Sequence, residues 1–142
     1  MSTQQAQATW EGKLKDGRGR VQVPSQGFEA SYTAASRFEG GEGTNPEELI
    51  GAAHAACYSM FLSLLLGQAG FEPAEISTSA HVTIAEVDGA PTITTIELHT
   101  VGKVPDIDDQ RFNELAEEAK IGCPVSKALA GPTISLSAEL NG

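Results

Sequence analysis

Two cysteines are the residues of this chain best suited to chemistry, and the chain has no others. Cys57 stands in the long apolar stretch NPEELIGAAHAACYSMFLSLLL, and Cys123 stands in KIGCPVSKALAG. A thiolate can attack an electrophile, bind a metal, or form a disulfide with a second thiol. A buried cysteine, by contrast, is most often a small apolar side chain that does no chemistry. The sequence around each thiol has to separate these alternatives.

Two kinds of thiol site fit the sequence poorly. A zinc site uses close cysteine pairs together with histidines, whereas His54, His81 and His99 are scattered, so we expect no metal and no other cofactor. His54 precedes Cys57 by three residues, which would suit a Cys–His hydrolase. The two side chains would then be mere neighbours on one helix, with no evident third group to orient them. A redox-active pair remains as the alternative to two inert thiols.

Cys123 lies where a thiol should ionise easily. It directly precedes Pro124, and proline is favoured at the first position of a helix, so we predict a short helix over residues 124–130 with Cys123 at or near its cap. Backbone N–H groups and the helix dipole stabilise negative charge at a helix start, which lowers the pKa of a thiol. Lys127 adds one positive charge nearby.

Cys57 has no such help from its own helix. Asn45 can cap a helix and Pro46 fits the first turn, so the predicted helix begins about ten residues before Cys57. The effect of the helix end has died away at that distance, and burial alone would raise the pKa of the thiol. A reactive Cys57 therefore needs a cation from elsewhere. Among nine basic residues the best candidate is Arg37, on the glycine-rich loop before the helix.

The first half of the chain predicts strands followed by one long helix. Three short strands fall within residues 8–35, where Gly, Pro and Asp separate TWEGKL, GRVQVP and GFEASYTA. A glycine-rich loop over residues 36–46 leads into the helix. The helix runs to about Gln68 and is stopped by Gly70 and Pro73.

The second half predicts a hairpin, two helices and a final strand. Within residues 75–104, one face alternates from Ile76 to Ile84, an Asp-Gly turn follows, and the returning segment 93–101 is rich in β-branched residues. A helix over residues 106–120, closed by Gly122, precedes the short helix, and residues 133–140 alternate as a strand. This order, without a repeat or a linker, predicts a single α+β domain over residues 1–142 with an antiparallel sheet.

The composition limits which binding partners and which cellular compartment we expect for this protein. The net charge is −10, so we expect neither nucleic acid nor an anionic membrane surface as a partner, because both need basic contacts. Segment 49–66 reaches the lower length limit of a membrane span. However, polar residues interrupt it and no Lys or Arg flanks it, which favours the buried centre of a fold. The N-terminus has neither an apolar core nor a basic start, so we expect a cytoplasmic protein with reduced or redox-active thiols.

Three segments together resemble the OsmC/Ohr family. They are Ser36-Arg37-Phe38-Glu39-Gly40, the run TNPEELIGAAHAAC that ends at Cys57, and Gly122-Cys123-Pro124-Val125-Ser126. The opening WEGKLKDGRGRV and His54 resemble the OsmC branch. The resemblance covers essentially the whole chain, and the two cysteine motifs are specific in combination. It implies an α+β fold with antiparallel sheets packed around two central helices, in an intertwined homodimer.

The resemblance also implies the roles of four residues. Members of the family are peroxidases that reduce organic hydroperoxides with a cysteine pair and protect against oxidative stress. By this resemblance Cys57 is the peroxidatic thiol, Cys123 converts its sulfenic acid to a disulfide, and an external dithiol reduces that disulfide. Arg37 would stabilise the Cys57 thiolate, and Glu47 would orient Arg37.

Glu47 and Cys57 cannot share a site on one unbroken helix. Ten residues rise about 15 Å and turn about 280° around the axis. Either the helix breaks, or Glu47 serves the site of a partner chain. Small residues at a spacing of four would let two helices approach closely, or would simply pack within one chain: Gly51, Ala55, Ser59 and Ser63. We hypothesise a homodimer with paired central helices, in which Cys57 and Cys123 of one chain meet Glu47 of the other.

Three points stay open at the level of sequence. In the Ohr branch the arginine comes from an earlier loop, so Arg18 and Arg20 are alternatives to Arg37. Apolar residues near the thiol would favour a hydrophobic organic peroxide over hydrogen peroxide, unless they are ordinary core: Phe38, Met60, Phe61 and Leu64. The alternative function is a non-catalytic protein that senses redox state or binds an apolar ligand with the same cysteine pair.

Overall fold

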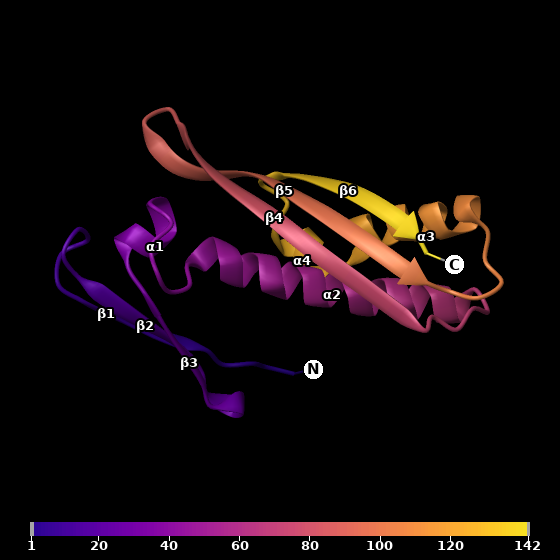
Figure 1. Cartoon of the computed structure of the whole chain (residues 1–142), viewed down its shortest axis with the longest axis horizontal. Coiled ribbons are helices and arrows are strands. Elements are labelled where there is room, and N and C mark those ends of the chain that lie inside the picture. Colours follow the sequence, from indigo (N-terminus) through magenta and orange to yellow (C-terminus); the bar gives the residue numbers. More distant parts are fainter. Residues whose placement is uncertain (1, 142) are drawn as a thin grey trace. The chain divides into compact units, whose positions relative to one another are not determined.

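The chain divides into two compact units, which are described one at a time. The computed structural model describes residues 2–141. The units comprise residues 1–49 and 50–142, so the division falls inside the long helix. Figure 1 shows the order of helices and strands along the chain.

The first unit contains a three-stranded antiparallel meander. Its elements are β1 (Gln7–Glu11), β2 (Arg18–Val23), a 3-10 turn (Pro24–Gln26) and β3 (Phe28–Tyr32). β2 lies between the other two strands and pairs with both. Gly27 adopts a left-handed conformation (φ 65°) in the turn before β3, where glycine carries no steric penalty. The three strands match those expected within residues 8–35.

A short helix, α1 (Ala34–Phe38), forms where the sequence predicts only loop over residues 36–46. Thr33 and Ser36 cap it reciprocally. Thr33 Oγ1 accepts the Ser36 N–H at 3.0 Å, and Ser36 Oγ accepts the Thr33 N–H at 2.8 Å. The usual capping box ends in Glu or Gln rather than Ser, so this pattern does not stand out in the sequence. The helix carries Arg37 in its last turn.

The long helix, α2 (Pro46–Gln68), has the bounds that the sequence predicts. Asn45 Oδ1 accepts the Glu48 N–H at 2.8 Å, as expected of a capping asparagine. The helix is continuous over its 23 residues. The helix thus crosses the division between the two units, with Glu47 in its first turn and Cys57 near its middle.

α2 is long and apolar enough to cross a membrane by length and composition, with a mean hydropathy of 1.7 over its most apolar window. Its side chains Tyr58, Leu62 and Leu66 are nevertheless fully buried in the protein core. A helix at the centre of a folded core passes the same test. A single helix of this kind is weak evidence of a membrane span, and 33% of its most apolar window is buried within the protein.

The second unit contains a mixed three-stranded sheet. Its strands, in spatial order, are β4 (Glu75–Val87), β5 (Ala90–Lys103) and β6 (Thr133–Leu140) (Figure 1). The hairpin turn has Asp88 at φ 52° and Gly89 at φ 79°, as the Asp-Gly signal predicts. β6 runs parallel to β5, rather than antiparallel as expected. The reason is the connection, because two helices cross back between these strands and a parallel pair needs such a crossover.

Those two helices are α3 (Asp109–Gly122) and α4 (Pro124–Ala128). α4 is two residues shorter than the helix predicted over residues 124–130. Gly122 is the last residue of α3, and an added Cβ there would lie 2.8 Å from the ring of Phe61. Close packing by Phe61, rather than a left-handed cap, is what favours glycine at this position.

One core joins the sheet to α2 and α3. Each of these elements contributes apolar side chains that are at least nine-tenths buried: Tyr58, Leu62, Leu66, Ile96, Leu98, Phe112, Leu115 and Ala119. Burying side chains of this size supplies about 1.5–3 kcal/mol each. Because Cys123 belongs to the same cluster, the core fixes the position of this thiol.

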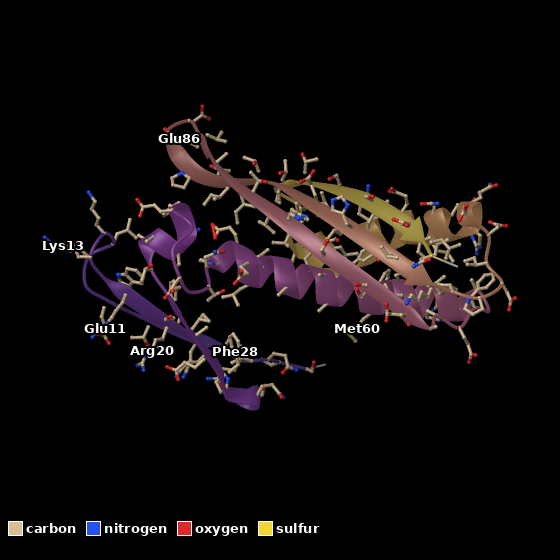
Figure 2. The ribbon with its side chains drawn as sticks, in the orientation of Figure 1. Glu11, Lys13, Arg20, Phe28, Met60 and Glu86 are labelled. Atoms are coloured by element: carbon tan, nitrogen blue, oxygen red, sulfur yellow. The ribbon has the colours of Figure 1, made fainter. Side chains whose placement is uncertain are left out.

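Two small residues of α2 pack against β4 of the same chain. A Cβ at Gly51 would lie 3.4 Å from Val82 Cγ2, and Ser59 Oγ donates to Thr78 Oγ1 at 2.8 Å. At these positions the small-residue stripe serves packing within one chain. A different row on α2, the exposed stripe, faces away from the core: Ala53, Ala56, Met60, Leu64 and Gly67. Figure 2 shows Met60 projecting from the helix.

Gly102→Ala is expected to destabilise the fold by about 1–3 kcal/mol, because overpacking a rigid core forces side chains to shift. A Cβ at Gly102 in β5 would lie 2.6 Å from Phe112 Cε1, and Phe112 is fully buried. Urea unfolding followed by circular dichroism measures the change. Gly67→Ala on α2 meets nothing within 4 Å and is the matched control, with a neutral or slightly stabilising effect. An unchanged midpoint for Gly102→Ala would contradict the rigidity of this contact.

Candidate active site

Cys57 and Cys123 meet within the second unit. Cys57 lies in the middle of α2 and is half-buried, whereas Cys123 lies between α3 and α4 and is fully buried. Both thiols are free, and each is within hydrogen-bonding reach of the other. The crossover between β5 and β6 therefore brings together two cysteines that are distant in sequence.

Cys123 is the N-cap of α4, and its thiol ionises more easily than usual. Its Sγ accepts the Ser126 N–H at 3.3 Å. Burial raises the pKa of Cys123, but hydrogen bonds from the side chain and backbone of Ser126, from Cys57 and from the Val125 N–H outweigh burial, and the pKa is lowered. At neutral pH a larger share of Cys123 is thiolate than in an unperturbed cysteine.

The pKa of the Cys57 thiol is raised. Burial is the largest cause; the Val125 N–H lowers the pKa, while a hydrogen bond and the negative charge of Cys123 raise it further. No cation from residues 50–141 is among these causes. The raised pKa has the direction that the sequence argument expected from burial alone.

Arg37 and Glu47 form a partly buried ion pair within the first unit. Arg37 Nε donates to both carboxylate oxygens of Glu47, at 2.8 and 3.2 Å. The Glu47 side chain is 7% exposed and that of Arg37 is 36% exposed. The guanidinium also lies over the Phe38 ring, 5.2 Å from its centroid. Only Nε of Arg37 is engaged in hydrogen bonds among the described residues, so its two terminal nitrogens can donate to an anion.

Arg18 and Arg20 lie on β2, in more exposed surroundings. Arg18 Nη2 lies 3.5 Å from Glu11 Oε2, and Arg20 Nη1 lies 3.2 Å from Glu29 Oε1. Exposed pairs of this kind contribute little to stability. Only Arg37 is held by a nearly buried carboxylate, so it is the better organised of the three candidate cations.

His54 and Ser126 form a buried pair that the sequence argument missed, since it assigned neither a role. His54 is 0% exposed, and its Nε2 lies 2.8 Å from Ser126 Oγ. His54 Nδ1 is buried without a hydrogen-bond partner among the described residues. Burial lowers the pKa of His54, so the ring is neutral near pH 7. The sequence did contain one local signal for Ser126. It stands three residues after the predicted N-cap Cys123, and the residue at that position often donates its N–H to the side chain of the cap.

Most of the apolar residues expected near Cys57 are exposed. Met60 is 75%, Leu64 51% and Phe38 48% exposed. Phe61 is half-buried and packs against Gly122, the residue before Cys123. Among residues 2–141, no three His, Cys, Asp or Glu side chains gather where they could hold a metal ion.

The fold and the site define a class of protein, namely an α+β protein with a contacting pair of free thiols of unequal acidity. Residues 39–137 match the family described as OsmC-like protein. The chain belongs to the OsmC family, and the family predicted from the sequence motifs is confirmed.

Individual relatives agree with this assignment. The chain is 52% identical over 124 residues to Peroxiredoxin OsmC of Escherichia coli (strain K12), and the match covers 87% of each chain. It is 34% identical over 93 residues to the Organic hydroperoxide resistance protein of Xanthomonas axonopodis pv. citri, covering 65% and 63%. The solved organic hydroperoxide resistance protein of Elizabethkingia anophelis superposes with a TM-score of 0.78 at 25% identity, covering 99% of both chains. The predicted α+β fold is confirmed.

Proposed function

We propose that this protein reduces organic hydroperoxides to alcohols and so protects against oxidative stress. As a member of the OsmC family it is a cysteine-based peroxidase. The observation that carries the proposal is the contact between a half-exposed Cys57 and a buried, more acidic Cys123. Relatives named for organic hydroperoxide resistance support this class of substrate.

The proposed reaction has three steps. The Cys57 thiolate attacks the distal oxygen of the hydroperoxide, the O–O bond breaks, and the alkoxide leaves and takes up a proton to give the alcohol. Cys123 then attacks the sulfur of the Cys57 sulfenic acid, so an S–S bond forms, the S–O bond breaks and water is released. An external dithiol finally reduces the disulfide and is itself oxidised to a disulfide.

Arg37, oriented by Glu47, supplies the positive charge in this proposal. The terminal nitrogens of Arg37 would stabilise the Cys57 thiolate and the charge that develops on the leaving oxygen. Glu47 and Cys57 are about 15 Å apart along the axis of a continuous helix. We therefore propose that the Arg37–Glu47 pair of one chain serves Cys57 of a second copy.

Two surfaces support a homodimer. In the first unit, the side chains that are at least nine-tenths buried are polar, namely Ser36, Thr44 and Glu47. A small sheet needs a packed apolar face for stability, yet Leu14 and Phe28 are 67% and 44% exposed (Figure 2 shows Phe28). The exposed stripe of α2 is the second apolar surface. A second copy of the chain would cover both. We also propose a cytoplasmic location, where cellular dithiols keep the cysteines reduced.

A steady-state assay tests the function. Hydrogen, tert-butyl, cumene and fatty-acid hydroperoxides are compared, each with a monothiol and with several dithiols. We expect turnover with the organic hydroperoxides and a dithiol, and slower consumption of hydrogen peroxide. One equivalent of disulfide formed without turnover, under every condition, would instead indicate a redox sensor. No reaction with any peroxide would indicate a binding protein.

Reduction of the disulfide is expected to begin with attack at the Cys57 sulfur. Cys123 is fully buried, whereas Cys57 is half-exposed. The lowered pKa of Cys123 also makes it the better leaving group. Oxidised protein treated briefly with a limiting monothiol, acid-quenched and digested should carry the mixed disulfide on Cys57, about tenfold over Cys123. A mixed disulfide found mainly on Cys123 would contradict this direction.

A further inference from the structure

The His54–Ser126 pair lies next to a thiol of the proposed reaction but has no part in the steps above. His54 comes from α2, one turn before Cys57, and Ser126 comes from the first turn of α4. Ser126 contacts Cys123 through its N–H, which donates to Sγ at 3.3 Å, and a hydrogen bond from its side chain is among the causes that lower the pKa of Cys123. Two elements thus converge on the buried face of Cys123.

The unpartnered nitrogen of His54 decides where the ring proton lies. A neutral imidazole carries its single proton on either Nδ1 or Nε2. His54 Nδ1 is buried without a partner among the described residues, and buried N–H groups without an acceptor are rarer in folded proteins than buried acceptors without a donor. The proton therefore lies on Nε2, which donates to Ser126 Oγ across 2.8 Å.

This tautomer fixes the direction of the serine hydroxyl. Ser126 has one hydroxyl proton, and its oxygen already accepts from His54 Nε2. The hydroxyl proton is then free to point at its other neighbour, Cys123 Sγ. With the opposite tautomer, the hydroxyl would donate to His54 and could not donate to the sulfur.

We propose that His54 is a positioning residue, which acts through Ser126 to hold a hydroxyl donor on Cys123 Sγ and thereby prepares Cys123 to attack the Cys57 sulfenic acid. This inference rests on the proposed function. In the step concerned, the Cys123 thiolate forms the S–S bond and hydroxide leaves Cys57. The hydroxide takes up the proton that the Cys123 thiol released, so the products are one disulfide and one water.

Other ionisable groups around Cys123 do not replace this arrangement. A hydrogen bond with Cys57 lowers the pKa of Cys123, and the charge of Cys123 in turn raises the pKa of Tyr58. Burial, and then the charges of Glu117 and Cys123, raise the pKa of Tyr58, which stays protonated and donates to the Ala116 carbonyl at 3.1 Å. His54 stays neutral because burial lowers its pKa, so it acts as a fixed donor rather than as a proton acceptor.

The first experiment measures the ionisation of Cys123 in the Cys57→Ser background by thiolate absorbance against pH. Ser126→Ala and His54→Leu should each lower the thiolate fraction at pH 7 about tenfold. His54→Gln places an amide N–H near the position of Nε2 and should stay within about twofold of the parent. The matched controls are Ser59→Ala, which removes a similar hydroxyl that bonds Thr78, and His81→Leu on an exposed face. Unchanged titration in both Ser126→Ala and His54→Leu would overturn the proposal.

The second experiment separates this inference from the proposed function. Stopped-flow mixing of the reduced protein with one equivalent of cumene hydroperoxide follows sulfenic acid and then disulfide formation. Ser126→Ala should leave the first step within about twofold and slow the second about threefold, because the loss of thiolate is partly offset by its greater nucleophilicity. A normal disulfide step in this variant would overturn the inference alone. No sulfenic acid in the unmodified protein would overturn the function itself.

The tautomer is also measurable without any substitution. Long-range ¹H–¹⁵N correlation spectra of the reduced protein should show His54 protonated at Nε2 and bare at Nδ1. Protonation at Nδ1 would overturn the proposal, whether or not the His54 variants fold.

Discussion

Cys57→Ser is expected to abolish peroxide reduction, with a loss of about 10³-fold or more. The attacking species is a thiolate, and a serine hydroxyl stays protonated at neutral pH and cannot form the sulfenic acid. Steady-state consumption of cumene hydroperoxide with a dithiol measures the loss. Cys123→Ser should behave differently, because its first turnover needs only Cys57. It should consume about one equivalent of peroxide and then stall with an oxidised Cys57.

The comparison of these two variants is the control for the assignment. A substitution that merely disturbs the structure would remove the first turnover as well as the later ones. The proposed roles instead predict that Cys123→Ser keeps the first turnover and that Cys57→Ser loses it. Ser59→Ala, two residues after Cys57 on α2, controls for disturbance of the helix and should retain turnover. Full turnover by Cys57→Ser would contradict the proposed chemistry, and a missing first turnover in Cys123→Ser would contradict the order of the two thiols.

Mixed dimers are expected to recover about half of the wild-type activity when one chain carries Glu47→Ala and the other carries Cys57→Ser. Each variant alone should be impaired, the first by about 10²–10³-fold because Arg37 loses the carboxylate that orients it. If Glu47 serves the partner's thiol, one site in the mixed dimer has every group intact. Purification with two affinity tags isolates the mixed species, and its turnover per dimer is compared with the wild type.

The reciprocal mixture supplies the control. When both substitutions lie on one chain and the partner is wild type, a shared site leaves no intact centre, whereas a site built within one chain leaves one. A shared site therefore predicts an intact centre only in the first mixture, and a site built within one chain predicts an intact centre only in the second. Activity in the second mixture but not in the first would refute the shared site, and a monomer by light scattering would refute the homodimer.

Local signals in the sequence were sufficient for most elements. The cap at Asn45 and Pro46 fixes where α2 begins, and the Asp-Gly pair fixes the β4–β5 hairpin. The parallel pairing of β6 could not be predicted in the same way, because strand direction depends on how the α3–α4 connection crosses the sheet. The short helix α1 was missed because its capping partner is Ser36 instead of Glu or Gln.

In the candidate site, too, some features follow from the local sequence and others depend on the folded chain. The position of Cys123 at a helix cap follows from the Cys-Pro dipeptide, and the unfavourable setting of Cys57 follows from its distance to the helix start. The hydrogen bond between His54 and Ser126 joins residues 72 positions apart. The sequence around neither residue predicts a contact with the other, so the contact is seen only in the folded chain.

The place of Cys123 at the start of α4 links the redox state of the protein to local order. The reduced sulfur satisfies the Ser126 amide of a helix only five residues long. A sulfur engaged in a disulfide carries no charge and accepts hydrogen bonds weakly, so α4 loses its cap on oxidation. We expect the backbone amide of Ser126 to exchange with deuterium faster in the oxidised protein, as the first turn of the helix frays. A reductant could then distinguish oxidised from reduced molecules by the flexibility of α4.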